Sequence, residues 1–385
     1  MKGGKTMDNH IVLSICIPTF NRRDVVYECV TEILNNYHKD DIAVIVVDNC
    51  STDGTREKLA EIHDVRFKYY RNDTNTKYMN LLIALSYAEG QFSMLLSDED
   101  NVDVVFLQEL VQYLDNKKDI ALVKTDEYNE MENKRTRFKC DVSSYYYKIV
   151  AVLHWGYLSG VIFNNRLSLP VLRKLKLNDY QKFLRTIGEY PHVWLALMIC
   201  HRGALVFYQK ALVVRAREAK SDNISDKNKL NEFPWINDRR FKQMAAMCKS
   251  FKHLQLAQLN SSEKIGLYCN RLRQLMKSTC FYYYSNLYGE TYENVMRSYH
   301  PEEIEKLEYW RKQPQHVLKN IYMSYVTVNR FMVKSLWKTK TDFIKDYLKN
   351  FGSICRLYHD TIKEYQKTRK YLKEINSRSN VRGTL

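Results

Sequence analysis

The stretch Phe92-Ser93-Met94-Leu95-Leu96-Ser97-Asp98-Glu99-Asp100-Asn101 places an apolar run directly before three acidic residues. A run of this kind is typical of a strand that is buried on both faces of a parallel sheet. Three adjacent carboxylates repel one another unless a cation lies between them. Oxygen ligands of this type suit Mg²⁺ or Mn²⁺ carrying a phosphate. The stretch therefore predicts either a metal site at a sheet edge or a solvated turn before a helix that Asp103 caps.

Strand and helix patterns alternate around this stretch over the first 125 residues. We predict strands at 11–17, 43–47, 66–70 and 92–96, and helices at 24–37, 55–62, 77–88 and 102–114. Such alternation predicts right-handed crossovers and a mostly parallel sheet with helices on both faces. Ligands bind beyond the carboxyl ends of the strands in sheets of this type. We therefore expect one sheet edge to gather the polar segments 19–21, 48–49 and 98–100.

The charge distribution divides the chain into two parts. Residues 236–385 carry 28 basic and 13 acidic side chains, whereas residues 1–235 carry 32 and 31. Residues 126–235 mix strand and helix patterns, and the chain beyond them has a helical pattern with few breakers. The step in charge predicts a domain boundary near residue 235.

The composition excludes several classes of protein. With 45% hydrophobic and 27% charged residues, the chain has the profile of a folded protein rather than a disordered one. The nine cysteines show no C-x-x-C spacing, which argues against a zinc site and favours buried free thiols in a reducing compartment. No apolar stretch of about 18 residues is present, so we expect no membrane span. The first residues lack the apolar core of a signal peptide.

Four short motifs follow one another in the first hundred residues: SICIPTFNR at 14–22, VVDNCSTDGT at 46–55, NDTN at 72–75 followed by Asn80, and SDED at 97–100. In order and spacing they resemble the motifs of family-2 inverting glycosyltransferases, closely over residues 11–115 and loosely over 150–220. The resemblance implies a GT-A fold, which is an α/β, Rossmann-like, mostly parallel sheet flanked by helices. We expect it over residues 11–235, after an N-terminal extension at 1–10 and before a basic helical domain at 236–385.

The resemblance also implies a site for a nucleotide-sugar donor and a divalent cation. Its nucleotide-binding residues would be Thr19, Phe20, Asn21, Asp48, Asn75, Asn80 and Asp98. Asp48 would accept a hydrogen bond from the base edge, and Asp100, with Asp98, would hold Mn²⁺ or Mg²⁺. Such an ion stabilises the charge on the departing diphosphate. Structural interpretations stay open: Asp48 as a turn cap, Phe20 as a core residue, and Asn75 and Asn80 as turn residues.

Inversion requires a base that deprotonates the acceptor hydroxyl. The family usually places an E-D pair at the start of a helix, but residues 188–194 (GEYPHVW) lack that pair. Glu189 and His192 are the candidates, with Asp126 a weaker third. A helix dipole would keep Glu189 ionised, and imidazole has a suitable pKa. Alternatively, Glu189 is an acid near a helix N-cap and His192 a buried core residue.

Two further segments have open interpretations. Leu158-Ser159-Gly160 resembles the acceptor-side glycine motif of the family, where a small residue allows close approach of the sugar. The basic C-terminal domain fits an anionic membrane surface, self-association through its helices, or a solvated basic face. It carries no nucleic-acid-binding motif, so we expect no nucleic-acid partner.

These features predict a metal-dependent inverting glycosyltransferase that uses a nucleotide-diphosphate sugar, with UDP favoured. The acceptor would be a glycan, a lipid-linked glycan or a glycoprotein in bacterial surface polysaccharide or protein glycosylation. We expect it in the cytoplasm, at the inner face of the plasma membrane. The alternatives are a nucleotidyltransferase, which would more often show a glycine-rich phosphate loop, and a non-enzymatic basic protein that binds membranes or nucleic acid. The presence of Asp98 and Asp100 argues against the non-enzymatic alternative.

Overall fold

The computed structural model describes residues 10–130, 133–139, 142–175 and 190–215, with isolated positions between 254 and 267. The chain divides into two compact units, Met1–Ile224 and Ser225–Leu385. The expected extension at 1–10 and the helical domain at 236–385 lie almost entirely outside the described residues. The boundary near residue 235 stays a prediction.

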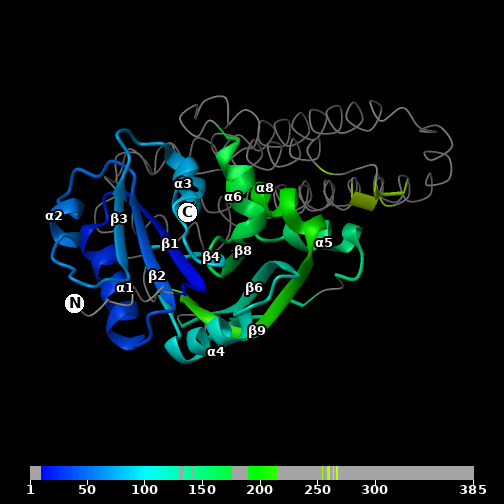
Figure 1. The fold of residues 1–385 in the computed structure, drawn as a ribbon, viewed down its shortest axis with the longest axis horizontal. Coiled ribbons are helices and arrows are strands. Elements are labelled where there is room, and N and C mark those ends of the chain that lie inside the picture. The colour runs from blue at the N-terminus through cyan, green and yellow to red at the C-terminus, as the bar shows by residue number, and fades with distance from the viewer. Residues whose placement is uncertain are drawn as a thin grey trace, which may run out of the picture. The chain divides into compact units, whose positions relative to one another are not determined.

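Within the described residues, nine strands form one sheet in the order β3-β2-β1-β4-β8-β6-β9-β5, with β7 paired to β6 (Figure 1). The strands are β1 Leu13–Thr19, β2 Ile42–Asp48, β3 Phe67–Arg71, β4 Phe92–Leu95, β5 Asn101–Val102, β6 Ile120–Asn129, β7 Lys134–Thr136, β8 Val161–Asn164 and β9 Ala204–Arg215. Strands β3, β2, β1 and β4 are parallel. Strand β8 is antiparallel to both β4 and β6, and β6 is parallel to β9. Therefore β6 and β9 run in the same direction as β4.

Helices cover both faces of the sheet. They are α1 Arg23–Asn36, α2 Thr55–Leu59, α3 Asn80–Ser86, α4 Val104–Leu114, α5 Tyr145–Val152, α6 Asn165–Arg173 and α8 Pro191–Ile199, with 3₁₀ turns η1 Lys77–Met79 and η2 Cys200–Arg202. Helices α3, α6 and α8 lie on one side of the sheet, and α1 and α4 lie on the other (Figure 1). Every residue of β2 is buried, as expected for a strand covered on both faces.

The α/β fold class expected from the sequence is confirmed for these residues, and the eight predicted elements match to within a few residues. Asp103 caps α4 by accepting a hydrogen bond from the backbone N–H of Phe106 at 3.0 Å. Cys16, Cys29 and Cys200 are buried free thiols, as predicted. Across the part of the chain that the structure describes, no helix combines the length and apolar character needed to cross a bilayer.

The strand directions bring the polar segments to one edge of the sheet. Thr19 ends β1, Asp48 ends β2 and Arg215 ends β9. Residues 98–100 directly follow β4. Because these strands run the same way, their carboxyl ends meet at a common edge. The gathering predicted from the sequence is observed.

Candidate active site

Asp98 is held by two side chains, one from the last residue of β1 and one from the loop that follows it. Its Oδ2 accepts a hydrogen bond from Thr19 Oγ1 at 2.7 Å. Arg22 Nη1 donates to Asp98 Oδ1 at 2.8 Å and to Glu99 Oε2 at 3.0 Å. Burial raises the pKa of Asp98, and the Arg22 guanidinium opposes that shift. Arg22 thus supplies part of the positive charge that the acidic residues 98–100 require. The sequence pattern did not indicate this role for Arg22.

Asp100 is almost completely buried and receives two hydroxyl groups. Its Oδ2 accepts hydrogen bonds from Tyr157 Oη at 2.5 Å and from Ser159 Oγ at 2.6 Å. The same Ser159 Oγ accepts the backbone N–H of Ser97 at 2.9 Å. Hydrogen bonds to a carboxylate favour its ionised form and restrict its orientation. The two hydroxyl donors therefore fix the orientation of the Asp100 carboxyl group beside Asp98.

The carboxylates of residues 98–100 fit a divalent ion whose remaining ligands come from a substrate. Among the described residues, no group of three or more His, Cys, Asp or Glu side chains could hold a metal ion. Mg²⁺ is commonly bound by one or two carboxylates together with substrate phosphates rather than by a protein cage. Asp98 is already paired with the guanidinium of Arg22, whereas Tyr157 and Ser159 give Asp100 only neutral hydroxyl donors, so Asp100 is the carboxylate better suited to such an ion.

A buried ion pair lies on β6 behind this site. The fully buried Lys124 Nζ donates to Glu127 Oε1 at 2.6 Å and to the Ser159 carbonyl at 2.7 Å. Burial lowers the pKa of Lys124, and Glu127 opposes that shift.

Asp126 Oδ2 accepts hydrogen bonds from Arg135 at 3.0 and 2.7 Å. These two hydrogen bonds from one guanidinium to the same oxygen, and the burial of Asp126, disfavour it as a base that reaches an acceptor.

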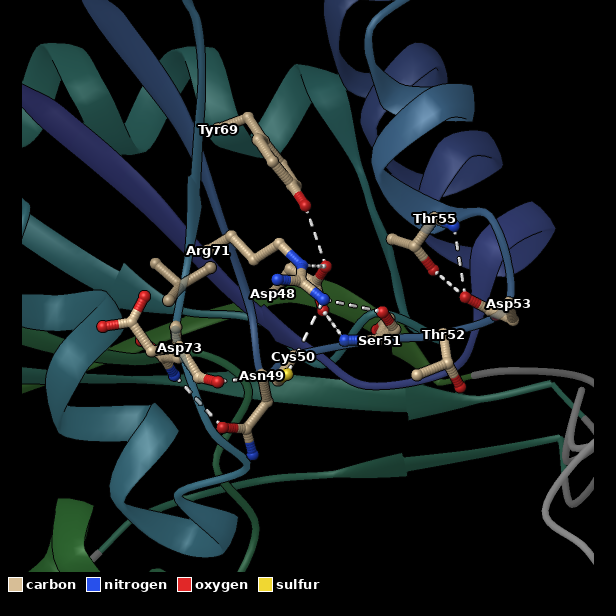
Figure 2. Close-up of polar contacts among 12 residues, drawn as sticks. Asp48, Asn49, Cys50, Ser51, Thr52, Asp53, Thr55, Tyr69, Arg71 and Asp73 are labelled. Atoms are coloured by element: carbon tan, nitrogen blue, oxygen red, sulfur yellow. Dashed lines mark hydrogen bonds and ion pairs between the residues drawn. The ribbon is translucent and has the colours of Figure 1, made fainter.

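Figure 2 shows the surroundings of Asp48 at the end of β2. Its buried carboxylate accepts hydrogen bonds from the backbone N–H of Ser51 and from Tyr69 Oη, both at 2.8 Å. Arg71 Nε lies 3.5 Å from Asp48 Oδ2. Ser51 Oγ in turn accepts the backbone N–H of Asn21 at 2.8 Å. Asp48 therefore caps the turn, as the structural interpretation had it, and also lies at the expected nucleotide edge.

An amide cluster occupies the position next to Asp48. Asn49 Nδ2 donates to Asn75 Oδ1 at 2.9 Å, and Asn72 Nδ2 donates to Asn80 Oδ1 at 2.8 Å. Asn80 Nδ2 reaches the Val47 carbonyl at 2.8 Å. These bonds attach the loop after β3 to the end of β2. The structure brings Asn75 and Asn80 to the same sheet edge as Asp48, where both amides take part in holding that loop.

Thr19, Phe20 and Asn21 lie at the same edge of the sheet, where β1 ends. Phe20 is 42% exposed, so it is not a core residue. An exposed aromatic ring directly after β1 suits stacking on a base. Asn21 Oδ1 accepts the backbone N–H of Thr52 at 2.9 Å and ties the two loops together.

Of the two principal base candidates, Glu189 lies outside the described residues. His192 is buried, and its Nε2 lies 3.0 Å from the Trp155 carbonyl. Burial lowers the pKa of His192 to about 4, so the ring is neutral near pH 7. Trp155 and Trp194 are buried as well. This environment is typical of a core histidine and disfavours His192 as the base.

The buried state of His192 predicts an acid-dependent loss of stability. Its pKa is about 4 in the folded protein and about 6.5 in an unfolded chain. As the pH falls through this window, the unfolded chain binds a proton that the folded protein does not. From pH 7 to pH 5 the free energy of unfolding should therefore fall by about 2 kcal/mol through this residue.

The measurement is urea unfolding of the wild type and His192→Gln at both pH values. Glutamine can replace the donated hydrogen bond but carries no titratable group. The wild type should lose about 2 kcal/mol more than the variant between the two pH values. Equal losses would contradict the assignment of a buried neutral histidine.

Parts of the chain are similar in sequence to known sugar transferases. Residues 14–169 match the model named Glycosyl transferase family 2. The abequosyltransferase RfbV of Salmonella typhimurium is 28% identical over 238 residues, which cover 57% of this chain and 69% of RfbV. The poly(ribitol-phosphate) beta-N-acetylglucosaminyltransferase TarS of Staphylococcus aureus is 28% identical over 143 residues, which cover 33% of this chain and only 23% of TarS.

A third relative and one solved structure complete the comparison. The GalNAc(5)-diNAcBac-PP-undecaprenol beta-1,3-glucosyltransferase of Campylobacter jejuni is 32% identical over 104 residues, which cover 26% of this chain and 33% of the relative. The crystal structure of S. aureus TarS 1–349 in complex with UDP-GlcNAc matches with a TM-score of 0.49 and 14% identity. That match covers 86% of this chain and 92% of the TarS fragment.

Proposed function

We propose that this chain, whose residues 14–169 match the model named Glycosyl transferase family 2, is a glycosyltransferase whose reaction is inverting, metal-dependent and supplied by a UDP-sugar. The observation that carries this proposal is the gathering of Asp48, Asp98 and Asp100 at one edge of the sheet. These three carboxylates are buried and are held by neighbouring donors in fixed orientations. A nucleotide-sugar donor offers three parts to be held, the base, the ribose and the diphosphate, which is one for each carboxylate.

Each residue has a defined part in this proposal. Asp48 accepts the imide N–H of uracil, and Phe20 packs on the base. Asp98, oriented by Thr19 and Arg22, contacts the ribose. Asp100 holds Mn²⁺ or Mg²⁺. When bound, this ion supplies stabilisation of the charge on the departing diphosphate.

We propose Glu189 as the base, because His192 is buried and neutral. A carboxylate with an ordinary pKa is ionised near pH 7 and can accept the proton of an attacking hydroxyl. Glu189 is the acidic residue of 188–194, the segment comparable with the family's base-carrying helix start, although this segment lacks the E-D pair.

We propose a surface glycan, lipid-linked glycan or glycoprotein as the acceptor. The names of the relatives support this class, since one acts on poly(ribitol-phosphate) and another on a PP-undecaprenol-linked glycan. We also propose that the protein works at the inner face of the plasma membrane. There, the excess positive charge of residues 236–385 would attract anionic lipids, with self-association of this region as the alternative.

The direct test is thermal unfolding with UDP, GDP or dTDP, each with Mn²⁺ or with a chelator. A ligand at about 100 times its Kd stabilises the folded state by about 2.7 kcal/mol, which raises the midpoint by roughly 3–6 °C. We expect this shift with UDP and Mn²⁺, and a much smaller one with the chelator. An unchanged midpoint with all three nucleotides in Mn²⁺ would refute the proposal.

A further inference from the structure

Tyr157 makes two contacts that join separate parts of the sheet edge. Its hydroxyl donates to Asp100 Oδ2 at 2.5 Å. Its ring lies under the guanidinium of Arg215, with Cζ 4.3 Å from the ring centroid. Asp100 follows β4, Tyr157 precedes β8 and Arg215 ends β9. One side chain thus touches an anion and a cation that are 115 residues apart in the chain.

The backbone that carries Tyr157 is itself anchored. Two residues further on, Ser159 donates its hydroxyl to the same Asp100 oxygen at 2.6 Å. The carbonyl of Ser159 accepts a hydrogen bond from the buried Lys124 Nζ at 2.7 Å. The loop before β8 is therefore fixed on β6, so the position of the Tyr157 hydroxyl is well defined.

The charge on Arg215 is retained at this position. Burial lowers the pKa of Arg215, but Tyr157, Glu127 and Asp100 oppose it, and the net shift is upward. A guanidinium on an aromatic face gains a cation–π attraction while its N–H groups remain able to bind an anion. The ring of Tyr157 thus separates a fixed positive group from a fixed carboxylate.

We propose that Tyr157 is a positioning residue that holds Asp100 and Arg215 as a pair around the diphosphate of the donor. This inference rests on the proposed function. A nucleoside diphosphate with a divalent ion carries both a positive and a negative group. The cation would bind Asp100, and the phosphate oxygens would bind a guanidinium. The hydroxyl of Tyr157 orients Asp100 for the metal ion, and its ring positions Arg215 for the phosphate oxygens.

The two contacts can be separated by substitution. Tyr157→Phe keeps the ring under Arg215 and removes only the hydrogen bond to Asp100. Outer-shell hydrogen bonds to metal ligands are worth about tenfold or more in metal affinity. We therefore expect the Mn²⁺ concentration that half-saturates UDP binding to rise about tenfold in calorimetry, with UDP binding in chelator unchanged.

Tyr157→Leu removes both contacts and should also weaken UDP binding in chelator, to the same extent as Arg215→Gln. The double variant Tyr157→Leu/Arg215→Gln should bind metal-free UDP no more weakly than Arg215→Gln alone, because the ring acts through the guanidinium. Additive losses in the double variant would overturn the ring's part in the proposal.

Tyr37→Phe is the matched control. The Tyr37 hydroxyl donates to Asp41 Oδ1 at 2.7 Å, so this variant also loses a tyrosine–carboxylate bond, but outside the proposed site. If the wild type shows no Mn²⁺-dependent UDP binding, the proposed function fails. If the wild type binds and Tyr157→Phe has the same Mn²⁺ requirement as Tyr37→Phe, only the positioning role of Tyr157 fails.

Discussion

Asp100→Asn is expected to lower the rate of sugar transfer by about a thousandfold, which corresponds to about 4 kcal/mol of activation free energy. Asparagine has the size of aspartate but lacks its charge, so it binds a divalent cation far more weakly. Its amide must also face the hydroxyl donors Tyr157 and Ser159, which hold the carboxylate in the wild type. The measurement is product formation from a UDP-sugar at saturating donor and Mn²⁺.

The control is Asp115→Asn. Asp115 is the C-cap of α4, at the opposite end of that helix from the proposed metal ligand, and its side chain is 40% exposed. This variant should transfer sugar at the wild-type rate. The thermal midpoint of Asp100→Asn should be measured in parallel, so that lost activity is not confused with unfolding. A folded Asp100→Asn protein with wild-type turnover would remove Asp100 from the proposed mechanism.

Gly160→Ala is expected to destabilise the folded protein by about 3 kcal/mol. Gly160 has a φ of +73°, and a Cβ at this position would lie 2.2 Å from Thr125 Oγ1 and 3.1 Å from Val213 Cγ2. The left-handed backbone costs roughly 1–2 kcal/mol for a residue with a Cβ. Overpacking costs typically about 1–3 kcal/mol more. Urea unfolding should show the loss as a lower midpoint.

Two variants make this prediction specific. At Gly156 an added Cβ would meet no atom within 4 Å, so Gly156→Ala should change the stability by less than about 1 kcal/mol. Adding Thr125→Ala to Gly160→Ala removes the closest clash and should recover part of the loss. Equal stability of Gly160→Ala and Gly156→Ala would contradict the steric argument. The small size of Gly160 thus has a cause in sheet packing, beside any approach of an acceptor sugar.

The strand-end residues of the site were predictable because they follow local patterns. Asp48 and Asp98 each come after an apolar run, and the direction of parallel strands places such positions at one edge. The cap at Asp103 was visible for the same local reason. Arg22 was missed, although it belongs to the first motif and the crowded carboxylates required a counter-charge.

The partners of Asp100 were not predictable, because they depend on strand pairing. Strand β8 is antiparallel to β4, and this register places Leu95 opposite Val161. The pairing brings residues 157–160 next to residues 97–100. No periodicity in the sequence indicates which two strands become neighbours. Tyr157 and Lys124 therefore gained a role only from the fold.

By itself, the sequence determined the α/β alternation, the buried strands β1, β2 and β4, and the acidic segment at their edge, since each depends on residues close together in the chain. The tertiary structure alone decided that Arg22 neutralises Asp98 and that His192 is a buried neutral ring. It also decided that Tyr157 joins Asp100 to Arg215. The physical reason is that charge compensation, burial and orientation depend on neighbours that only packing brings together.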